Sequence, residues 1–251
     1  MSSPRRQDLP RVVFGVCRLL VFALLFLTTA VTAPLVPGLT RRRRVVSAFA
    51  RAGLRTLGLD VDIDGLDQLP AGSCVLVANH GIYLDGLVMQ AMLPPRCAFV
   101  IKREAEHVPL VGWLLRLIGS EFLARHHRGE RHRDARRLMR RAEEGQSLVF
   151  FPEGTFTGDA GLRKFHMGAF ATAMRAGRPL VPAVIHGARR ALPNNARIPR
   201  PGRIRVEVLE PLRVDGARDA IETLRDAARH SILARLDEPD LLAAASAGQH
   251  A

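Results

Sequence analysis

The chain has 251 residues, of which 47% are hydrophobic, and it carries a formal net charge of +13. This length is enough to bury the core of one α/β domain with an additional segment. The three cysteines, Cys17, Cys74 and Cys97, are odd in number and lack the spacing of metal ligands. Neither a disulfide framework nor a zinc site is therefore predicted.

The positive charge is concentrated near the N-terminus. Residues 1–57 contain ten arginines and a single acidic residue, Asp8. Such a block favours a polyanionic partner, either nucleic acid or an anionic lipid surface. Because the apolar residues 19–38 lie between the arginine groups, an anionic membrane surface is favoured and no nucleic-acid partner is expected.

The apolar residues 19–38 approach the roughly 20 residues needed to span a bilayer. Arginines flank them on both sides, and Pro34 and Pro37 interrupt a straight helix near its end. We favour a helix lodged in one leaflet, with its arginines on anionic head groups, over a transmembrane span. A signal peptide is a further alternative, because the arginines at 5–11 resemble a basic leader region.

Residues 1–58 are interpreted as a basic pair of membrane-docking helices joined by the proline-bearing link, with the second helix over 45–58. From residue 59 onward, predicted strands and helices alternate along the chain. Strands are predicted at 59–64, 73–79, 97–102, 121–125, 147–151, 179–187 and, as an edge strand, 203–211; helices are predicted at 85–93, 109–119, 130–144, 165–177 and 217–236. This order predicts an α/β domain over 59–236, with a mixed, mostly parallel sheet flanked by helices. Residues 237–251 read as a flexible C-terminal tail.

The stretch "ANHGIYLDG" at 78–86 places His80 and Asp85 five positions apart, directly after an apolar strand. Five residues fit neither one face of a helix nor one face of a strand, so the two side chains can meet only across a bend. Gly81 permits such a bend. A histidine held by a carboxylate is a general base, whereas the alternative is that Asp85 only caps the following helix.

Two further turns carry polar groups. The buried strand before "FPEGT" ends at Glu153, whose carboxylate is costly there unless it is solvated or paired, and Gly154 and Thr155 form the turn. The stretch "GSEFLAR" ends at Arg125, and arginine is suited to binding a phosphate or carboxylate group. Strand ends at one sheet edge favour a shared cleft.

Four sequence blocks, in one order, resemble the lysophospholipid acyltransferase family of the 1-acylglycerol-3-phosphate acyltransferase type. They are "NHGIYLD" at 79–85, "GSEFLAR" at 119–125, "FPEGT" at 151–155 and "LVPAVIHG" at 180–187. The resemblance covers about residues 45–212 and implies transfer of an acyl group from acyl-CoA or acyl-carrier protein to a lysophospholipid hydroxyl. It also implies an enzyme without a metal or other cofactor, at the cytoplasmic face of the cell membrane.

The resemblance also assigns roles to individual residues. It implies that His80 is the general base and that Asp85 orients it and stabilises its charged form. It implies that Arg125 and Glu153 bind the glycerol-phosphate end of the acceptor. The substrate-binding residues that it implies are Asn79, Arg125, Glu153, Gly154 and Thr155.

The chain departs from the family at two places. The family commonly continues its third block as E-G-T-R-S, but Phe156 and Thr157 stand in the last two positions here. His166 and Met167 occupy a site that is often Lys-Lys. Either Arg163 and Lys164 substitute for the missing cations, or the acceptor carries less phosphate charge. The departures therefore affect the identity of the acceptor, and one alternative is a different lysolipid or aminoacyl-lipid acceptor. A separate alternative is a non-catalytic basic membrane-binding protein with this fold.

Overall fold

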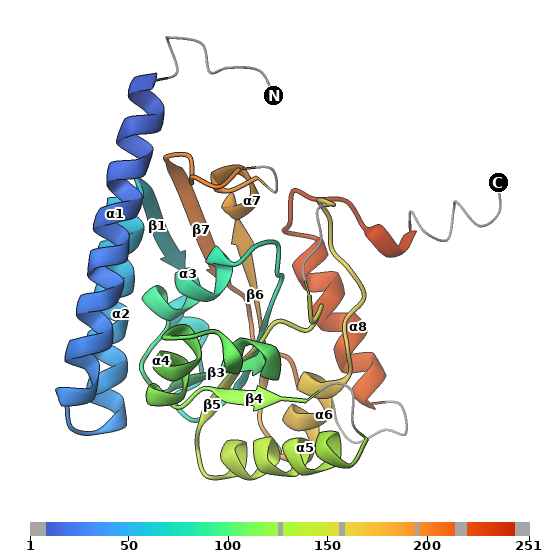
Figure 1. Cartoon of the computed structure of the whole chain (residues 1–251). Helices are drawn as coiled ribbons and strands as arrows, with labels where there is room; N and C mark the ends of the chain where they lie inside the picture. Colours follow the sequence, from blue (N-terminus) through green and yellow to red (C-terminus); the bar gives the residue numbers. More distant parts are fainter. Residues whose placement is uncertain (1–8, 125–127, 156–158, 194–195, 214–219, 244–251) are drawn as a thin grey trace.

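The structure is a computed structural model, and it describes residues 9–124, 128–155, 159–193, 196–213 and 220–243. Helices surround one central sheet (Figure 1). The helices are α1 (Leu9–Thr32), α2 (Leu39–Thr56), α3 (Leu84–Met92), α4 (Val111–Leu117), α5 (Arg128–Glu143), α6 (Gly168–Arg175), α7 (Ala188–Ala191) and α8 (Ala220–Leu233). Short 3₁₀ turns are η1 (Ala33–Leu35), η2 (Leu66–Gln68) and η3 (Arg103–His107). The strands are β1 (Leu59–Asp64), β2 (Val75–Ala78), β3 (Cys97–Lys102), β4 (Glu121–Leu123), β5 (Ser147–Phe150), β6 (Leu180–His186) and β7 (Gly202–Val208).

The strands form a seven-stranded sheet in the order β1-β7-β6-β2-β5-β3-β4. Every neighbouring pair is parallel except β6 and β7. This arrangement confirms the predicted mixed, mostly parallel sheet. The central strand β2 is buried throughout, as expected for a continuous apolar run covered on both faces.

The prediction that 203–211 forms an edge strand is wrong, because β7 pairs with β1 on one side and β6 on the other. The alternation in its sequence has a different cause. Ile204 and Val206 are buried on one face of the sheet, whereas the other face at this end is open to solvent. On that open face Arg203 forms a cross-strand ion pair with Asp62 of β1.

Successive residues of a strand point to opposite faces, so the sheet supplies two cores. In β2, Leu76 joins the core beneath α2 and α3, whereas Val75 and Val77 join the core beneath α5, α6 and α8. Each fully buried leucine or valine contributes on the order of 1.5–3 kcal/mol relative to exposure. The helices on the two faces thus fix the direction of β2 and of the turn that follows it.

The helices α1 and α2 form a hairpin that lies along one side of the domain (Figure 1). The predicted helix pair is therefore present, but α2 begins at Leu39 and includes the four arginines that were expected to precede it. The hairpin contacts the domain at both ends. A Cβ on Gly15 would lie 2.7 Å from Ile198, while Ala33 and Phe26, near the link, join a core cluster with α4.

Two of the four consecutive arginines are structural rather than free for lipid. Arg43 is buried and donates to the carbonyls of Ile118 and Gly119, at 2.7 and 3.2 Å, and to Pro95 at 3.1 Å. Arg42 donates to the carbonyl of Leu117 at 3.0 Å. Carbonyls at a helix C-terminus carry partial negative charge, so both guanidinium groups cap α4. Burial lowers the pKa of Arg43. The exposed side chains are Arg41 and Arg44.

The C-terminal segment differs from the flexible tail expected from residue 237. Leu162 donates to the carbonyl of Pro239 at 2.9 Å, and Leu241 donates to the carbonyl of Leu162 at 3.2 Å. Arg229 of α8 forms an ion pair with Asp240. The chain therefore stays attached to the domain as far as residue 243; residues 244–251 lie outside the described part.

Candidate active site

Three parallel neighbours, β6, β2 and β5, end at the same edge of the sheet. Each strand is followed there by polar residues from one of the blocks that sequence analysis singled out. Because β2 lies between the other two, the turn after it contacts both neighbouring turns. The sheet topology thus brings Glu153 to Asn79 and His80, although it follows His80 by 73 positions in the chain.

The bend predicted between His80 and Asp85 is present. Asp85 Oδ2 lies 3.1 Å from His80 Nδ1 and also accepts hydrogen bonds from the backbone N–H groups of Gly81, at 2.6 Å, and Ile82, at 2.8 Å. Asp85 is 1% exposed, while the His80 side chain is 17% exposed. A carboxylate only accepts, so Nδ1 carries the proton and Nε2 is the acceptor nitrogen of the ring. A carboxylate that orients an imidazole through Nδ1 is the arrangement that general-base chemistry requires.

The ring of His80 is also fixed by an aromatic neighbour that sequence analysis did not identify. Phe151, directly after β5, stacks on the imidazole with ring centroids 4.3 Å apart and planes 22° from parallel. Phe151 stands at the first position of "FPEGT", so its place in that block was the available signal. Together with Asp85 it defines both the tilt and the rotation of the imidazole.

Glu153 joins two turns instead of facing open solvent. Its Oε1 accepts from the backbone N–H of His80 at 2.7 Å, and its Oε2 accepts from the N–H of Arg163 at 3.0 Å. The residue is 3% exposed. Burial raises the pKa of Glu153, and the two backbone hydrogen bonds partly offset that effect. This carboxylate thus fixes the main chain at His80. Sequence analysis predicted only a role in substrate binding for Glu153.

The other predicted binding residues have defined surroundings. The side-chain amide of Asn79 donates to the carbonyl of Ile185 at 3.1 Å and accepts from its N–H at 2.7 Å, which ties the end of β2 to β6. Gly154 has φ +73°, a conformation that favours glycine, and Thr155 is partly buried beside it. Asn79 therefore holds the strand ends together.

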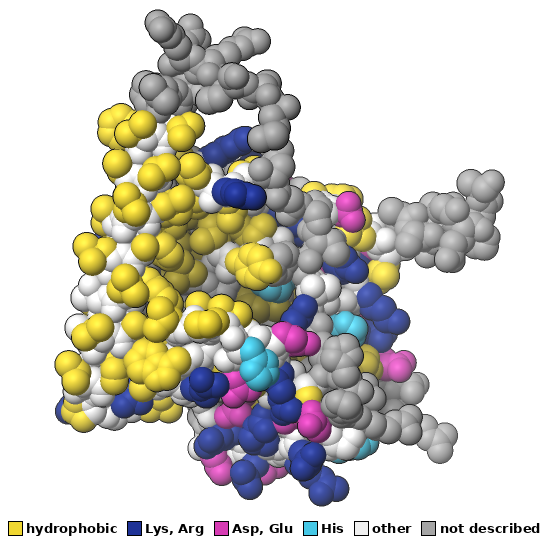
Figure 2. Space-filling view, viewed as in Figure 1, with side chains coloured by type: hydrophobic (Ala, Val, Ile, Leu, Met, Phe, Trp, Pro, Cys, Tyr) yellow, Lys and Arg dark blue, Asp and Glu magenta, His cyan; other side chains and the backbone are white. Residues whose placement is uncertain are grey.

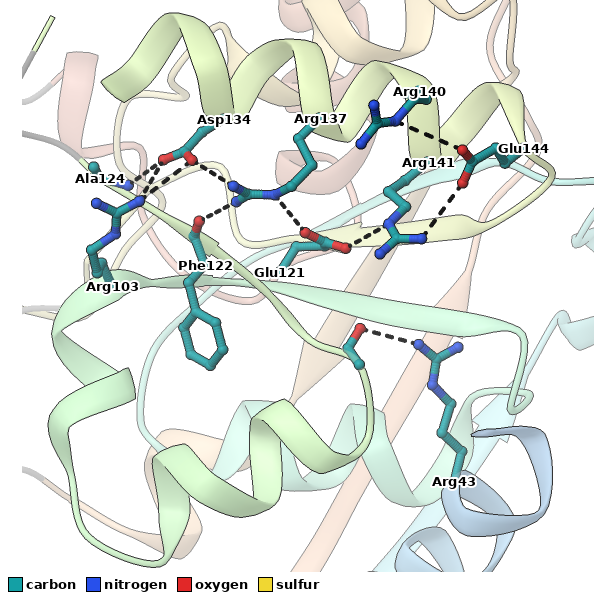
Figure 3. Close-up of polar contacts among 11 residues, drawn as sticks. Arg43, Arg103, Glu121, Phe122, Ala124, Asp134, Arg137, Arg140, Arg141 and Glu144 are labelled. Carbon is teal, nitrogen blue, oxygen red and sulfur yellow. Dashed lines mark hydrogen bonds and ion pairs between the residues drawn. The ribbon is translucent and has the colours of Figure 1, made fainter. Parts of the chain in front are cut away.

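Arg125, Phe156 and Thr157 lie outside the described residues. The chain leading to Arg125 is nevertheless held by a charged network between β4 and α5 (Figure 3). Asp134 accepts from the N–H of Ala124 at 2.8 Å, and Arg137 bridges Asp134 and Glu121 at 2.8 and 2.9 Å. The side chain of Arg137 thus points toward the domain, so only part of the basic run on α5 is surface charge.

Metal ligation was not predicted, and the described ranges contain no group of three or more His, Cys, Asp or Glu side chains placed to hold an ion. The titratable side chains that the structure pairs at this sheet edge are those of His80 and Asp85.

Comparison with known proteins places this geometry in context. The Acyltransferase family model matches residues 60–186, which is half of the chain and includes the three strand ends of the site. A yeast (Saccharomyces cerevisiae) 1-acyl-sn-glycerol-3-phosphate acyltransferase is 28% identical over 72% of this chain and 61% of its own length. A Chlamydomonas reinhardtii protein of the same name is 31% identical over 88% of this chain and 68% of its own length. The mouse (Mus musculus) 1-acyl-sn-glycerol-3-phosphate acyltransferase alpha is 33% identical over 70% of this chain and 63% of its own length.

The fold has a counterpart among solved structures. The crystal structure of the 1-acyl-sn-glycerophosphate (LPA) acyltransferase from Thermotoga maritima superposes with a TM-score of 0.73 at 19% identity, covering 90% of this chain and 95% of that one. This likeness concerns the fold. The chain spans less than two thirds of the length of the yeast and mouse relatives. The family match and these relatives show that the chain belongs to the acyltransferase family, in its 1-acylglycerol-3-phosphate acyltransferase type.

Proposed function

We propose that this protein is an O-acyltransferase that moves a fatty acyl group from a thioester, acyl-CoA or acyl-carrier protein, to the free hydroxyl of a lysophospholipid. The observation that carries the proposal is the His80–Asp85 pair, in which a buried carboxylate holds Nδ1 and so fixes the tautomer whose basic nitrogen is Nε2. 1-Acylglycerol 3-phosphate is the proposed acceptor, giving phosphatidic acid, because the relatives' names specify it.

In this mechanism His80 Nε2 removes the hydroxyl proton while the hydroxyl oxygen attacks the thioester carbonyl. The tetrahedral intermediate then collapses, the C–S bond breaks, and the imidazolium returns the proton to the departing thiolate. Asp85 stabilises the imidazolium between these two steps. Proton transfer of this kind supplies about 10²–10⁴-fold in rate, and alignment of the two bound substrates supplies more. Within this proposal Arg125 and Glu153 bind the glycerol-phosphate end, and Asn79, Gly154 and Thr155 shape its pocket.

The departures at Phe156, His166 and Met167 bear on the acceptor. They remove cations from positions at which the family commonly has them, so a second candidate is the same reaction on a lysolipid with a less charged head group. Mass spectrometry of the products formed from a panel of lysolipids with acyl-CoA or acyl-carrier protein distinguishes the two. Phosphatidic acid as the main product supports the first; an acylated neutral or aminoacyl lipid instead supports the second.

The role of His80 is tested by His80→Ala, with His132→Ala on the exposed surface of α5 as the matched control. We expect turnover to fall by at least about 10²-fold in His80→Ala and to be unchanged in the control. Full activity of His80→Ala refutes the mechanism. A wild-type protein that binds vesicles but forms no product supports a non-catalytic membrane-binding protein.

We further propose that the hairpin docks in one leaflet of an anionic membrane at its cytoplasmic face. The helix α1 is long and apolar enough to cross a membrane by length and composition. Its outward side chains form an apolar surface, visible along the left of Figure 2: Val12, Val13, Phe14, Val16, Leu20, Val21, Leu24, Leu27 and Val31. Its other side lies against α2 and the domain, whereas a spanning helix is surrounded by lipid or by other spanning segments.

Labelling on vesicles tests the one-leaflet arrangement. Single cysteines at residue 6 and residue 41, in a Cys17→Ser background, are expected to react with an impermeant maleimide from the same side. Labelling from opposite sides contradicts one-leaflet docking and indicates a span. Leu24→Asp, on the exposed surface of α1, is expected to weaken vesicle binding without changing the melting temperature of the protein.

A further inference from the structure

A guanidinium group lies directly on the turn that carries His80. The short helix α7, which follows β6, brings Arg189 back over the end of β2, where its Nη1 donates to the carbonyl of Gly81 at 3.2 Å. A Cβ added to Gly81 would lie 2.9 Å from Arg189 Nε. Gly81 does not have a positive φ, so a larger residue at this position would not strain the backbone but would require the Arg189 side chain to move.

Arg189 is held from its other side by the C-terminal segment. Its Nε lies 3.1 Å from both carboxylate oxygens of Glu238, and Glu238 Oε2 also accepts from the backbone N–H of Gly161 at 2.9 Å. The two side chains are only 16% and 21% exposed. An ion pair with this little access to water is screened less than a surface pair, and its hydrogen bonds fix its direction.

Gly161 begins the loop that supports Glu153. Within that loop Leu162 bonds to the C-terminal segment through both its N–H and its carbonyl, and Arg163 donates its N–H to Glu153. Glu153 in turn accepts from the N–H of His80. The contacts therefore form a closed circuit that leaves the His80 turn through Glu153 and the 161–163 loop, and returns to it through Glu238 and Arg189.

We propose that Arg189 and Glu238 are positioning residues for acyl transfer, and that residues 236–243, the C-terminal strap, are part of the catalytic architecture. The proposal rests on the acyltransferase function proposed above. Asp85 holds the N–H groups of Gly81 and Ile82, and Glu153 holds the N–H of His80; Arg189 supplies the hold on the carbonyl side of the same turn. Without it the imidazole loses its fixed distance from the bound hydroxyl, and misplacement of about 1 Å costs up to about 10²-fold in rate.

A double-mutant cycle on the full-length protein tests this proposal. We expect Arg189→Ala and Glu238→Ala each to lower kcat by about 10- to 100-fold, with KM for the lysolipid within about twofold of wild type. The double variant is expected to be no worse than the more affected single variant, because the two residues act as one unit. Glu238→Gln keeps an acceptor for Gly161 and Arg189, so it is expected to recover most of the lost kcat. The matched control is Arg235→Ala, which breaks an exposed ion pair with Glu207.

Hydrogen exchange provides a readout that does not depend on activity. The amides of residues 80–82 are expected to exchange faster in Arg189→Ala and Glu238→Ala than in wild type, and at the wild-type rate in Arg235→Ala. Removal of residues 237–251 is expected to reproduce the loss of kcat, whereas removal of 244–251 leaves kcat unchanged.

Several outcomes overturn the proposal. A raised lysolipid KM with wild-type kcat indicates that Arg189 contacts the acceptor itself. Additive single effects show that the two residues act separately, and a lower melting temperature with wild-type kcat and exchange at 80–82 indicates a role in stability only. If the wild-type protein turns over no lysolipid, the proposed function fails. If the amides of residues 80–82 exchange at the wild-type rate in every variant, the positioning role of the C-terminal strap is refuted, whether or not the protein is an acyltransferase.

Discussion

The carboxylate of Asp85 has two tasks that substitution can separate. It orients the turn by accepting from the N–H groups of Gly81 and Ile82, and it stabilises the charged form of His80. Asp85→Ala removes both, while Asp85→Asn keeps the shape of the side chain and removes the charge. We therefore expect the two variants to differ in stability and to agree in their loss of activity.

The structure sets the size of each effect. In Asp85→Ala two buried N–H groups lose their acceptor, and at about 1–3 kcal/mol each the free energy of unfolding falls by about 2–6 kcal/mol. In Asp85→Asn the amide oxygen takes the place of Oδ2, and the amide nitrogen takes the place of Oδ1, which has no hydrogen-bond partner among the described residues. The buried amide N–H finds no acceptor at that position, so the free energy of unfolding falls by about 1–3 kcal/mol, less than in Asp85→Ala. In contrast, kcat falls by about 10²-fold or more because the imidazolium loses its counter-charge.

The assay combines urea denaturation with initial rates of acyl transfer on mixed micelles, and Asp226→Asn, at an exposed position on α8, is the control. If Asp85→Asn keeps kcat within about threefold of wild type, the charge of Asp85 does not assist the reaction and the proposed proton transfer is refuted. If Asp85→Asn is as unstable as Asp85→Ala, the amide has not replaced the carboxylate in the turn.

Three further predictions concern stability. Arg43→Met is expected to lower the free energy of unfolding in urea by about 2–4 kcal/mol, because three backbone carbonyls lose their donor. The control Arg44→Met, at the exposed neighbouring position, is expected to change it by less than about 0.5 kcal/mol. Equal effects of the two substitutions contradict the capping role of Arg43. The ion pair with Arg229 lowers the pKa of Asp240 to about 2, from an ordinary value of 3.8. This stabilisation is therefore fully present above the ordinary pKa and is lost as the pH falls through about 2. Asp240→Asn is expected to be less stable than wild type at pH 7, and the difference in the free energy of unfolding is expected to be largely lost at pH 2 in chemical denaturation. A constant difference across this range rules out that origin. Gly154→Ala forces an alanine to φ +73° at a cost of about 1–2 kcal/mol, visible as a lower melting temperature, and an unchanged melting temperature contradicts the strain argument.

Patterns within short stretches of sequence account for the elements and for the central pair. Continuous apolar runs predict buried strands such as β2, because a strand covered on both faces needs apolar residues at every position. The spacing of His80 and Asp85 fits neither helix nor strand, so a bend was required, and the structure places the two side chains 3.1 Å apart. Both inferences depend on neighbouring residues only, which is why the sequence carries them.

Contacts between distant residues could not be predicted in this way. The place of β7 inside the sheet depends on which strands pair with it, and an alternating pattern arises equally at an edge or beside a solvent-facing neighbour. From the sequence, Arg42 and Arg43 were expected to bind lipid head groups, but in the structure they donate to carbonyls at the C-terminus of α4. Their charge is a local property, but the partner of that charge is set by tertiary packing.

The sequence by itself determined an α/β domain with an apolar, basic N-terminal segment, and it placed His80 and Asp85 at the end of a buried strand, where a bend allows them to meet. Only the tertiary structure decided what holds that pair in place: Phe151 on the ring, Glu153 on the His80 amide, and Arg189 with Glu238 on the carbonyl side of the turn. These contacts join residues that lie between 49 and 108 positions apart in the chain. No local pattern encodes them, because hydrogen bonds of this kind exist only once the sheet has set its strand order.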